Sequence, residues 1–142
     1  MTIGSVLRGK GTVVETIAAD APVFDAVCKL GEKRIGALLV IDQDRIAGIM
    51  SERDVIYCLR EQGLEVLQSP VSRVMTAPAI TAESSMSVLS ALALMTQRRI
   101  RHLPVVDGGQ LQGIVSIGDL VKYRIDRIEA DAEAMRSYIQ AV

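Results

Sequence analysis

The chain has 142 residues, of which 49% are hydrophobic and only 3% aromatic, so its core has to be built from aliphatic side chains and methionine. Its 16 basic and 17 acidic residues leave a formal net charge of −1, and this balance, without a basic stripe, argues against a nucleic-acid-binding surface. We find neither an apolar run of the ~20 residues that a membrane-spanning helix needs nor a signal peptide at the N-terminus. We therefore expect a cytoplasmic protein that is not attached to a membrane. Its two cysteines, Cys28 and Cys58, fall in helical patterns and are expected to be reduced, buried side chains.

After a short lead-in, the first half of the chain predicts a strand, a helix, two strands and a second helix. β-Branched residues favour a strand over residues 12–17, and apolar residues at helical spacing follow Asp20, which we expect to cap the first helix. Continuous apolar runs predict strands over residues 37–41 and 46–50, joined by a turn. A helix is expected from Ser51 to near Gly63, with Val55, Ile56 and Leu59 facing inward.

The second half of the chain predicts the same order of elements after a junction that runs from Pro70 to Pro78. The expected elements are a strand over 78–81, a helix cap at Ser84–Ser85, a helix with Val88, Leu89, Leu92 and Met95 on one face, strands over 103–106 and 111–115 around a hairpin turn at 107–109, and a last helix from Ser116.

The two halves of the chain are copies of each other. Residues 48–54 and residues 113–119 have Gly, Ile, Ser and Asp at the same four positions, at an offset of 65 residues. The longer segments 34–54 and 99–119 share nine identical residues in 21 aligned positions. Self-similarity at a fixed offset indicates an internal repeat. We therefore predict an α/β (α+β) fold of two β-α-β-β-α repeats packed with pseudo-twofold symmetry. The expected boundaries are 6–66 and 70–125 for the repeats, and 118–142 for a long C-terminal helix.

Each copy ends a strand and opens a helix at a serine, and this turn suits the binding of an anion. Free backbone N–H groups and the positive end of the helix dipole favour phosphate, to which the serine hydroxyl adds a hydrogen bond. The carboxylate three residues later would repel phosphate, but it can accept two hydrogen bonds from a ribose diol. Ser51 with Asp54, and Ser116 with Asp119, therefore indicate a nucleotide site. The alternative is that both pairs only form capping boxes at the helix starts.

The two copies differ at one position that matters for phosphate, because Arg53 in the first copy is Gly118 in the second. Arg53 is either a bidentate clamp for phosphate or an ordinary arginine on an exposed helix face. We expect the two sites to be inequivalent. If only one takes a phosphorylated ligand, the site with Arg53 is our prediction.

The last helix carries an apolar stripe with heptad spacing over three heptads. Its members are Val121, Ile125, Ile128, Ala132, Met135, Ile139 and Val142. Either this stripe lies on the core of its own chain, or it packs against the same helix of a second copy. The three-heptad length favours the dimer.

We find no catalytic set in the sequence, and we predict that the protein is not an enzyme. The single histidine, His102, has no cysteine or carboxylate cluster that would suggest a metal site, and neither cysteine has a histidine near it in sequence to activate it. The Gly9-Lys10-Gly11 stretch lacks the Gly-Lys-Ser/Thr that would complete a phosphate-binding P-loop. No metal and no catalytic cofactor are expected.

The two repeats resemble the cystathionine-β-synthase (CBS) domain, and the pair resembles a Bateman module. The segments that carry the resemblance are GALLVIDQDRIAGIMSERDV (residues 36–55) and RHLPVVDGGQLQGIVSIGDL (residues 101–120), and it covers about residues 6–125. The resemblance implies a regulatory module that binds an adenosyl nucleotide in the clefts between the repeats. AMP is the first expectation, with ADP, ATP, NAD or S-adenosylmethionine also in the family's range. It also implies a homodimer in the form of a four-repeat disk. Because the chain shows no effector domain of its own, the expected target is a separate protein.

The resemblance assigns roles to particular residues. It places Ser51, Asp54, Ser116 and Asp119 against phosphate and ribose, and we add Arg53 to this group. The adenine-facing positions would be Val13, Val14, Ala79, Ile80, His102, Leu103 and Pro104. Leu39 stands where the second repeat has Pro104, so the adenine wall of the first repeat departs from the family pattern. The alternative function is a structural dimerisation or interaction module without a ligand-dependent role.

Overall fold

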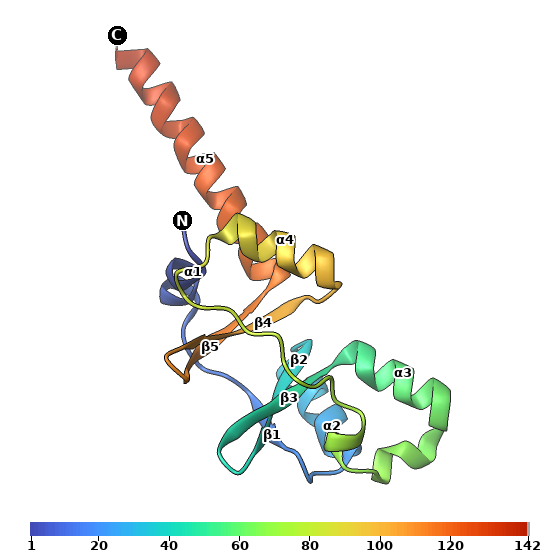
Figure 1. The fold of residues 1–142 in the computed structure, drawn as a ribbon. Coiled ribbons are helices and arrows are strands. Elements are labelled where there is room, and N and C mark those ends of the chain that lie inside the picture. Colours follow the sequence, from blue (N-terminus) through green and yellow to red (C-terminus); the bar gives the residue numbers. More distant parts are fainter. Residues whose placement is uncertain (142) are drawn as a thin grey trace. The chain divides into compact units, whose positions relative to one another are not determined.

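A computed structural model describes residues 1–141, which form two units (Figure 1). The first-repeat unit comprises residues 13–80, and the second-repeat unit comprises residues 1–12 together with residues 81–141. Each unit combines helices with a small sheet, and the last helix is long, so the predicted mixed α and β class is confirmed. One feature was not anticipated. Residues 6–12, which we grouped with the first repeat, pack against the second.

The first-repeat unit is built on a three-stranded sheet. Its elements are β1 (Thr16–Ala18), α2 (Val23–Lys33), β2 (Ala37–Asp42), β3 (Arg45–Ser51), α3 (Glu52–Gln62) and the 3₁₀ turns η1 (Leu64–Gln68) and η2 (Val71–Arg73). Strand β2 lies in the centre, parallel to β1 and antiparallel to β3. The turn between β2 and β3 has φ values of 50° and 62° at Gln43 and Asp44, the left-handed pair of a two-residue hairpin.

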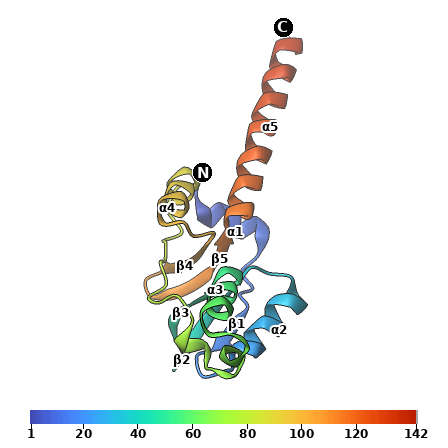
Figure 2. The ribbon, with the colours of Figure 1, turned by 90° about the vertical axis from the view of Figure 1, so that its right-hand side faces the viewer.

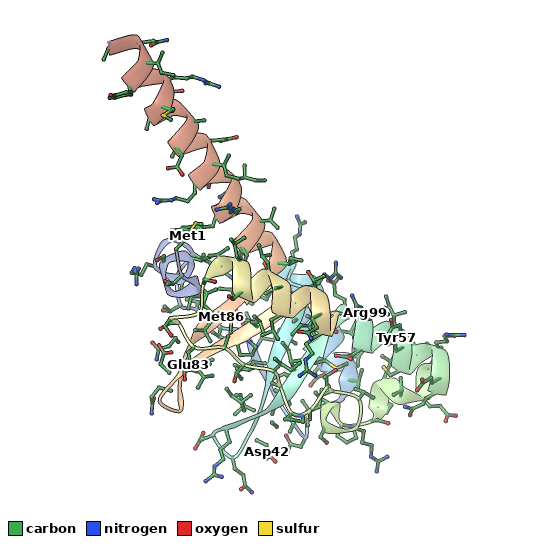
Figure 3. All side chains as sticks on the ribbon, turned by 45° about the horizontal axis from the view of Figure 1, so that its top comes forward. Met1, Asp42, Tyr57, Glu83, Met86 and Arg99 are labelled. Atoms are coloured by element: carbon green, nitrogen blue, oxygen red, sulfur yellow. The ribbon has the colours of Figure 1, made fainter. Side chains whose placement is uncertain are left out.

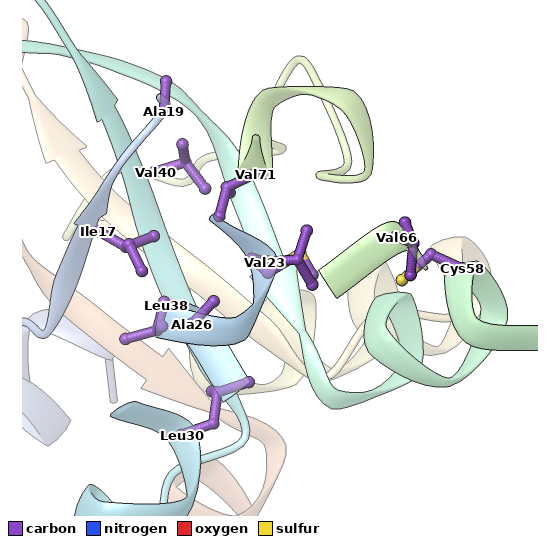
Figure 4. Close-up of a cluster of buried hydrophobic side chains, with 11 residues drawn as sticks. Ile17, Ala19, Val23, Ala26, Leu30, Leu38, Val40, Cys58, Val66 and Val71 are labelled. Carbon is purple, nitrogen blue, oxygen red and sulfur yellow. The ribbon is translucent and has the colours of Figure 1, made fainter. Parts of the chain in front are cut away.

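The core of the first-repeat unit gathers aliphatic side chains from the sheet, α2, α3 and both 3₁₀ turns (Figure 4). Residues 37–40 of β2 are all buried, so both faces of this strand are shielded from water. Helix α3 faces the core differently from the prediction. Ile56 is 63% exposed, whereas Cys58 is buried and Val55 and Leu59 are half-buried. The expectation of an inward-facing Ile56 was therefore wrong.

Helix α2 begins later than predicted. Pro22 has an extended conformation (φ −63°, ψ 147°) and pairs with Pro70, so the helix starts at Val23 with Pro22 as its N-cap. The predicted cap, Asp20, is exposed in the turn that precedes the helix. A residue followed by proline is driven away from the helical region, which explains why the helix does not begin before Pro22.

The second-repeat unit begins with a helix that we did not predict. Its elements are α1 (Ile3–Lys10), α4 (Val88–Arg98), β4 (His102–Asp107), β5 (Gln110–Ser116) and α5 (Ile117–Ala141). Thr2 caps α1 by accepting a hydrogen bond from the Ser5 N–H. The buried side chains of Val6 and Leu7 hold α1 on its unit, where it contacts α5 and β5.

The strand predicted over residues 78–81 is absent. Its first-repeat counterpart, predicted over residues 12–17, is observed only as β1 (Thr16–Ala18), and one residue accounts for the difference between the two repeats. In the first repeat, the Leu39 N–H donates to the Glu15 carbonyl and so ties β1 to β2. At the equivalent position, 65 residues later, Pro104 has no N–H to donate. Only Ala82 keeps the pairing, because its N–H donates to the Pro104 carbonyl and its carbonyl accepts from the Val106 N–H.

The predicted cap at Ser84–Ser85 was also wrong, because Ser87 caps α4 by accepting from the Ser90 N–H. Ser84 instead donates its N–H (2.9 Å) and its hydroxyl to the Asp107 carboxylate. These bonds lower the pKa of Asp107 and fix the segment before α4 to the end of β4.

Helix α5 runs for 25 residues as one continuous helix (Figure 2). Its one buried side chain among the described residues is Leu120, and every residue from Ile125 to Ala141 is exposed. The interpretation that the apolar stripe lies on its own core is therefore wrong for this part of the helix. Val142, the last member of the predicted stripe, lies outside the described residues. Among residues 1–141, no helix is both long and apolar enough to cross a bilayer.

Candidate nucleotide site

The first repeated turn forms a complete capping box at the start of α3. The Ser51 N–H donates to Asp54 Oδ2 (2.9 Å), and the Asp54 N–H donates to Ser51 Oγ (3.2 Å). The Ser51 hydroxyl lies 3.0 Å from the same carboxylate oxygen, to which it donates. These bonds hold both side chains at the positive end of the helix dipole.

The second repeated turn forms the same box at the start of α5. The Ser116 N–H donates to Asp119 Oδ2 (2.8 Å), and the Asp119 N–H donates to Ser116 Oγ (3.1 Å). Both copies therefore serve as helix caps. The caps do not exhaust the carboxylates, because each has about four lone-pair positions for hydrogen bonds.

A second residue also donates to each carboxylate, and the two residues differ in charge. They belong to residues 72–76 and residues 7–11, which we call the lead-in segments of the second and the first repeat. In the first-repeat unit, Thr76 Oγ1 donates to Asp54 Oδ1 (3.0 Å). In the second-repeat unit, Lys10 Nζ at the end of α1 lies 2.6 Å from Asp119 Oδ2 and 2.8 Å from the Ile114 carbonyl oxygen. One site is thus completed by a neutral hydroxyl and the other by an ammonium group.

The lead-in segments occupy equivalent positions in the two repeats, at the offset of 65 residues, but each one packs on the other repeat. Lys10 and Gly11 correspond to Met75 and Thr76. The segment that precedes the second repeat lies on the first repeat, and the segment that precedes the first repeat lies on the second. Because the exchanged partners are distant in sequence, no local pattern could have revealed either contact.

The glycine of each repeated turn provides the space for the lead-in segment. A Cβ atom on Gly48 would lie 2.5 Å from the Thr76 carbonyl oxygen, which accepts a hydrogen bond from the Ile49 N–H. A Cβ atom on Gly113 would lie 2.8 Å from Leu7 Cδ2. The motif therefore has glycine at this position in both copies so that a covering segment can approach the strand closely.

Asp119 has a charge environment that favours its ionised form. Partial burial by itself raises the pKa of Asp119, but the Lys10 ammonium and the Ser116 hydrogen bonds outweigh it, and the net effect is a lowered pKa. A group whose pKa is lower in the folded than in the unfolded protein stabilises the fold above its unfolded pKa, about 3.9 for aspartate. That contribution is lost as the pH falls through the folded-state pKa.

We therefore expect Asp119→Asn to reduce the acid sensitivity of the protein. The wild-type free energy of unfolding should fall below about pH 4, where Asp119 binds a proton in the unfolded chain but not yet in the folded protein, and part of this fall should be missing in the variant. Urea unfolding at pH 7, 5 and 3.5 measures the difference. Asp126→Asn, which removes an exposed carboxylate from α5, is the control. Identical pH dependence in Asp119→Asn and wild type would contradict the assignment.

The residues assigned to the adenine pocket differ in how deeply they are buried. Val14, Ala79 and Ile80 are half-buried in the first-repeat unit, but Val13 is 85% exposed. In the second-repeat unit, the Leu103 and Pro104 side chains are buried.

Two of the predicted residues lie beside a repeated turn. His102 is half-buried on β4 and directly opposite Ser116 in the β4–β5 register. Arg53 is half-buried in the first turn of α3. Asp54 also lines a surface pocket of about 150 Å³ with Tyr57, Glu61 and Arg73.

The described residues offer little for other chemistry. No group of three or more His, Cys, Asp or Glu side chains in residues 1–141 is arranged to hold a metal ion. Both cysteines are free thiols, and burial raises the pKa of Cys58, the reverse of what a nucleophilic cysteine needs.

We compared the chain with family models, with curated proteins and with solved structures. The family model of the CBS domain matches residues 11–61 and 71–126. The "CBS domain-containing protein CBSX3, mitochondrial" of Arabidopsis thaliana is 34% identical over 148 residues, which cover 98% of this chain and 72% of the relative.

Solved structures agree with this result. A putative signal-transduction protein with CBS domains from Burkholderia ambifaria MC40-6 superposes with a TM-score of 0.85 and 43% identity, over 89% of this chain and 95% of that one. CBSX2, solved in complex with AMP, superposes with a TM-score of 0.74 and 26% identity, over 88% of this chain and 96% of that one. The chain therefore belongs to the CBS domain family, and it carries two copies of the domain in tandem.

Proposed function

We propose that this protein is a non-enzymatic sensor of adenosyl nucleotides, with AMP as the first expected ligand and ATP, NAD or S-adenosylmethionine as further members of the class. The observation that carries the proposal is the repeated strand-to-helix turn, in which a serine and an aspartate occur together at the start of α3 and again at the start of α5. CBSX2, a structural relative, binds AMP, and this supports the choice of ligand.

The residues at each turn suit different parts of a nucleotide. Backbone N–H groups and the serine hydroxyls, Ser51 or Ser116, would take a phosphate oxygen, and Asp54 or Asp119 would accept hydrogen bonds from the ribose diol. The adenine base would lie near Val13, Val14, Ala79 and Ile80, and near His102 with the backbone of Leu103 and Pro104. Each carboxylate already serves as a cap, so ligand binding would add to a turn that is ordered beforehand.

The two sites would recognise phosphate with different cations. Arg53 lies in the first turn of α3, whereas the α5 site has Lys10, which belongs to a lead-in segment. A phosphate near Lys10 would compete with Asp119 for the ammonium group. Because α1 carries Lys10, ligand binding at this site would alter the contact that ties α1 to α5, and this is a physical route from ligand to conformation.

The signal would be passed to a separate protein by a homodimer. An adenosyl ligand can shift a conformational equilibrium only by its difference in affinity for two states. The alternative function, a structural interaction module without a ligand, keeps the exposed stripe of α5 as its interface and assigns no role in binding to the serine and aspartate pairs.

The test is the melting temperature of the protein with AMP, ADP, ATP, NAD, NADH and S-adenosylmethionine. A ligand at 100 times its dissociation constant should add about 2.7 kcal/mol to the free energy of unfolding, a rise of several degrees. Asp54→Asn and Asp119→Asn should each abolish the shift that comes from one site, and so report which site is filled.

Each variant is compared with its own melting temperature without ligand, because loss of a cap lowers stability in any case. Asp25→Asn, which removes an exposed carboxylate from the first turn of α2, is the matched control and should respond as wild type does. If none of the six ligands raises the melting temperature of the wild type, the sensor function is wrong and the structural alternative stands.

A further inference from the structure

The distal part of α5 has no support from its own unit. Helix α5 contacts α1, α4 and β5, but every residue from Ile125 to Ala141 is exposed, and Figure 3 shows the side chains of this part directed into solvent around the helix. Seventeen residues correspond to about 25 Å of helix. A single helix of this length is only marginally stable in water, so a covering partner would explain its persistence.

The exposed apolar stripe has the geometry of a coiled-coil seam. Its five large members are between 42% and 67% exposed, and they are Val121, Ile125, Ile128, Met135 and Ile139. With Ala132, they alternate at spacings of four and three residues, which places Ile125, Ala132 and Ile139 at heptad positions a and Val121, Ile128 and Met135 at positions d. Two copies of this stripe would bury each other.

The charges beside the stripe discriminate between the two orientations of such a pair. In a parallel coil, a residue at position g faces the residue at position e five places later on the other helix. Arg124 at g then faces Glu129 at e, and Asp131 at g faces Arg136 at e. Both pairs are of opposite charge, and twofold symmetry produces each pair twice.

Antiparallel pairing over the same layers would instead oppose e to e and g to g. Glu129 would face Glu129 of the other copy, Asp131 would face Asp131, and Lys122 would face Arg136. All three contacts bring like charges together, which is unfavourable. The charge pattern therefore favours a parallel pair of helices over an antiparallel pair.

We propose that α5 forms a parallel, in-register, two-stranded coiled coil with α5 of a second copy of this chain, and that the Arg124–Glu129 and Asp131–Arg136 pairs set its orientation. This proposal is independent of nucleotide binding. Arg136 already forms an exposed ion pair with Glu133 on its own helix (3.4 Å), and such exposed pairs exchange partners at little cost.

Disulfide crosslinking tests the orientation directly, even if a second dimer interface exists elsewhere in the protein. Ile139→Cys at position a should form a crosslinked dimer rapidly under mild oxidation, because the two copies of residue 139 meet only in the parallel register. Ser137→Cys at the outward position f is the matched control and should crosslink slowly. The unmodified protein measures any background from Cys28 and Cys58, and circular dichroism confirms that each variant is folded.

Charge reversal in the Ile139→Cys background tests the pairs that set the orientation. Arg124→Glu and Glu129→Lys should each lower the crosslinking rate by about tenfold, and the double variant should restore it, because it rebuilds the pair with reversed signs. The proposal is overturned if Ile139→Cys crosslinks no faster than Ser137→Cys, or if the double variant stays as slow as the single ones. A crosslink between Ile128→Cys and Ile139→Cys chains, without one between two Ile139→Cys chains, would show a staggered antiparallel pair and would also overturn it.

Discussion

Gly48→Ala is expected to lower the free energy of unfolding by about 3 kcal/mol, the upper end of the range for overpacking. The new methyl group would lie 2.5 Å from the Thr76 carbonyl oxygen and 2.9 Å from Met75 Sδ. The carbonyl is backbone, and it is held by a hydrogen bond from the Ile49 N–H (2.9 Å), so it cannot move without breaking the pairing of the lead-in segment with β3. Chemical denaturation of the two proteins measures the difference.

Gly31→Ala controls for the addition of a methyl group. No atom lies within 4 Å of the Cβ position at Gly31 in α2, so this variant should be as stable as the wild type or more stable by up to about 1 kcal/mol. A loss in Gly48→Ala that is no larger than the change in Gly31→Ala would show that the backbone contact at Thr76 is not what requires glycine.

Lys10→Met should weaken the binding of AMP but not that of adenosine, two ligands that differ only in the phosphate, which makes it a sharp test of the second site. Affinity for AMP should fall roughly 10–100-fold, because a hydrogen bond to a charged group contributes about 1.5–3 kcal/mol. Affinity for adenosine should stay equal or increase, since Asp119 no longer shares its carboxylate with an ammonium group 2.6 Å away. Isothermal titration calorimetry with both ligands measures the two effects.

Arg8→Met controls for net charge, because it removes one positive charge from the same helix. Arg8 is exposed and donates to the Ser5 hydroxyl (2.9 Å). It lies in the last turn of α1, as Lys10 does, but two residues along a helix correspond to a rotation of about 200°, which places Arg8 on the opposite side of α1. It should leave AMP affinity nearly unchanged at physiological salt. A fall in affinity that is the same for AMP and adenosine in Lys10→Met would indicate damage to the site as a whole and would contradict a phosphate contact by Lys10.

Some parts of the candidate site could be predicted from the sequence, because they depend on neighbouring residues alone. A serine and an aspartate three residues apart at a strand-to-helix junction form a capping box by local geometry, and both boxes are present. The hairpin turns at Gln43–Asp44 and Gly108–Gly109 were predictable for the same reason, since the positive φ angles at Asp44, Gly108 and Gly109 favour aspartate and glycine. Gln43 also has a positive φ, although glutamine is not among the residues that favour it.

The donors that complete each site could not be predicted in this way. Lys10 meets Asp119 across 109 residues, and Thr76 meets Asp54 across 22. The sequence hints at these donors only through the 65-residue offset, which makes Lys10 equivalent to Met75. This equivalence points to Asp119 only once the structure shows that each lead-in segment packs on the other repeat. The missing strand at residues 78–81 is an intermediate case. Proline at position 104 was visible, but its effect depended on which N–H the sheet would have used.

The repeat, the mixed α and β class and the two serine–aspartate turns could all be inferred from the amino-acid sequence, because periodicity, turn chemistry and capping act over a few residues. Tertiary structure alone decided which lead-in segment covers which repeat, and therefore that Asp54 receives a hydroxyl and Asp119 an ammonium group. It also decided that the stripe of α5 is exposed along its distal part, since burial depends on where the rest of the unit ends. The physical reason is the same in both cases. Contacts between segments distant in sequence are selected by packing of the whole unit, and no short stretch of sequence records them.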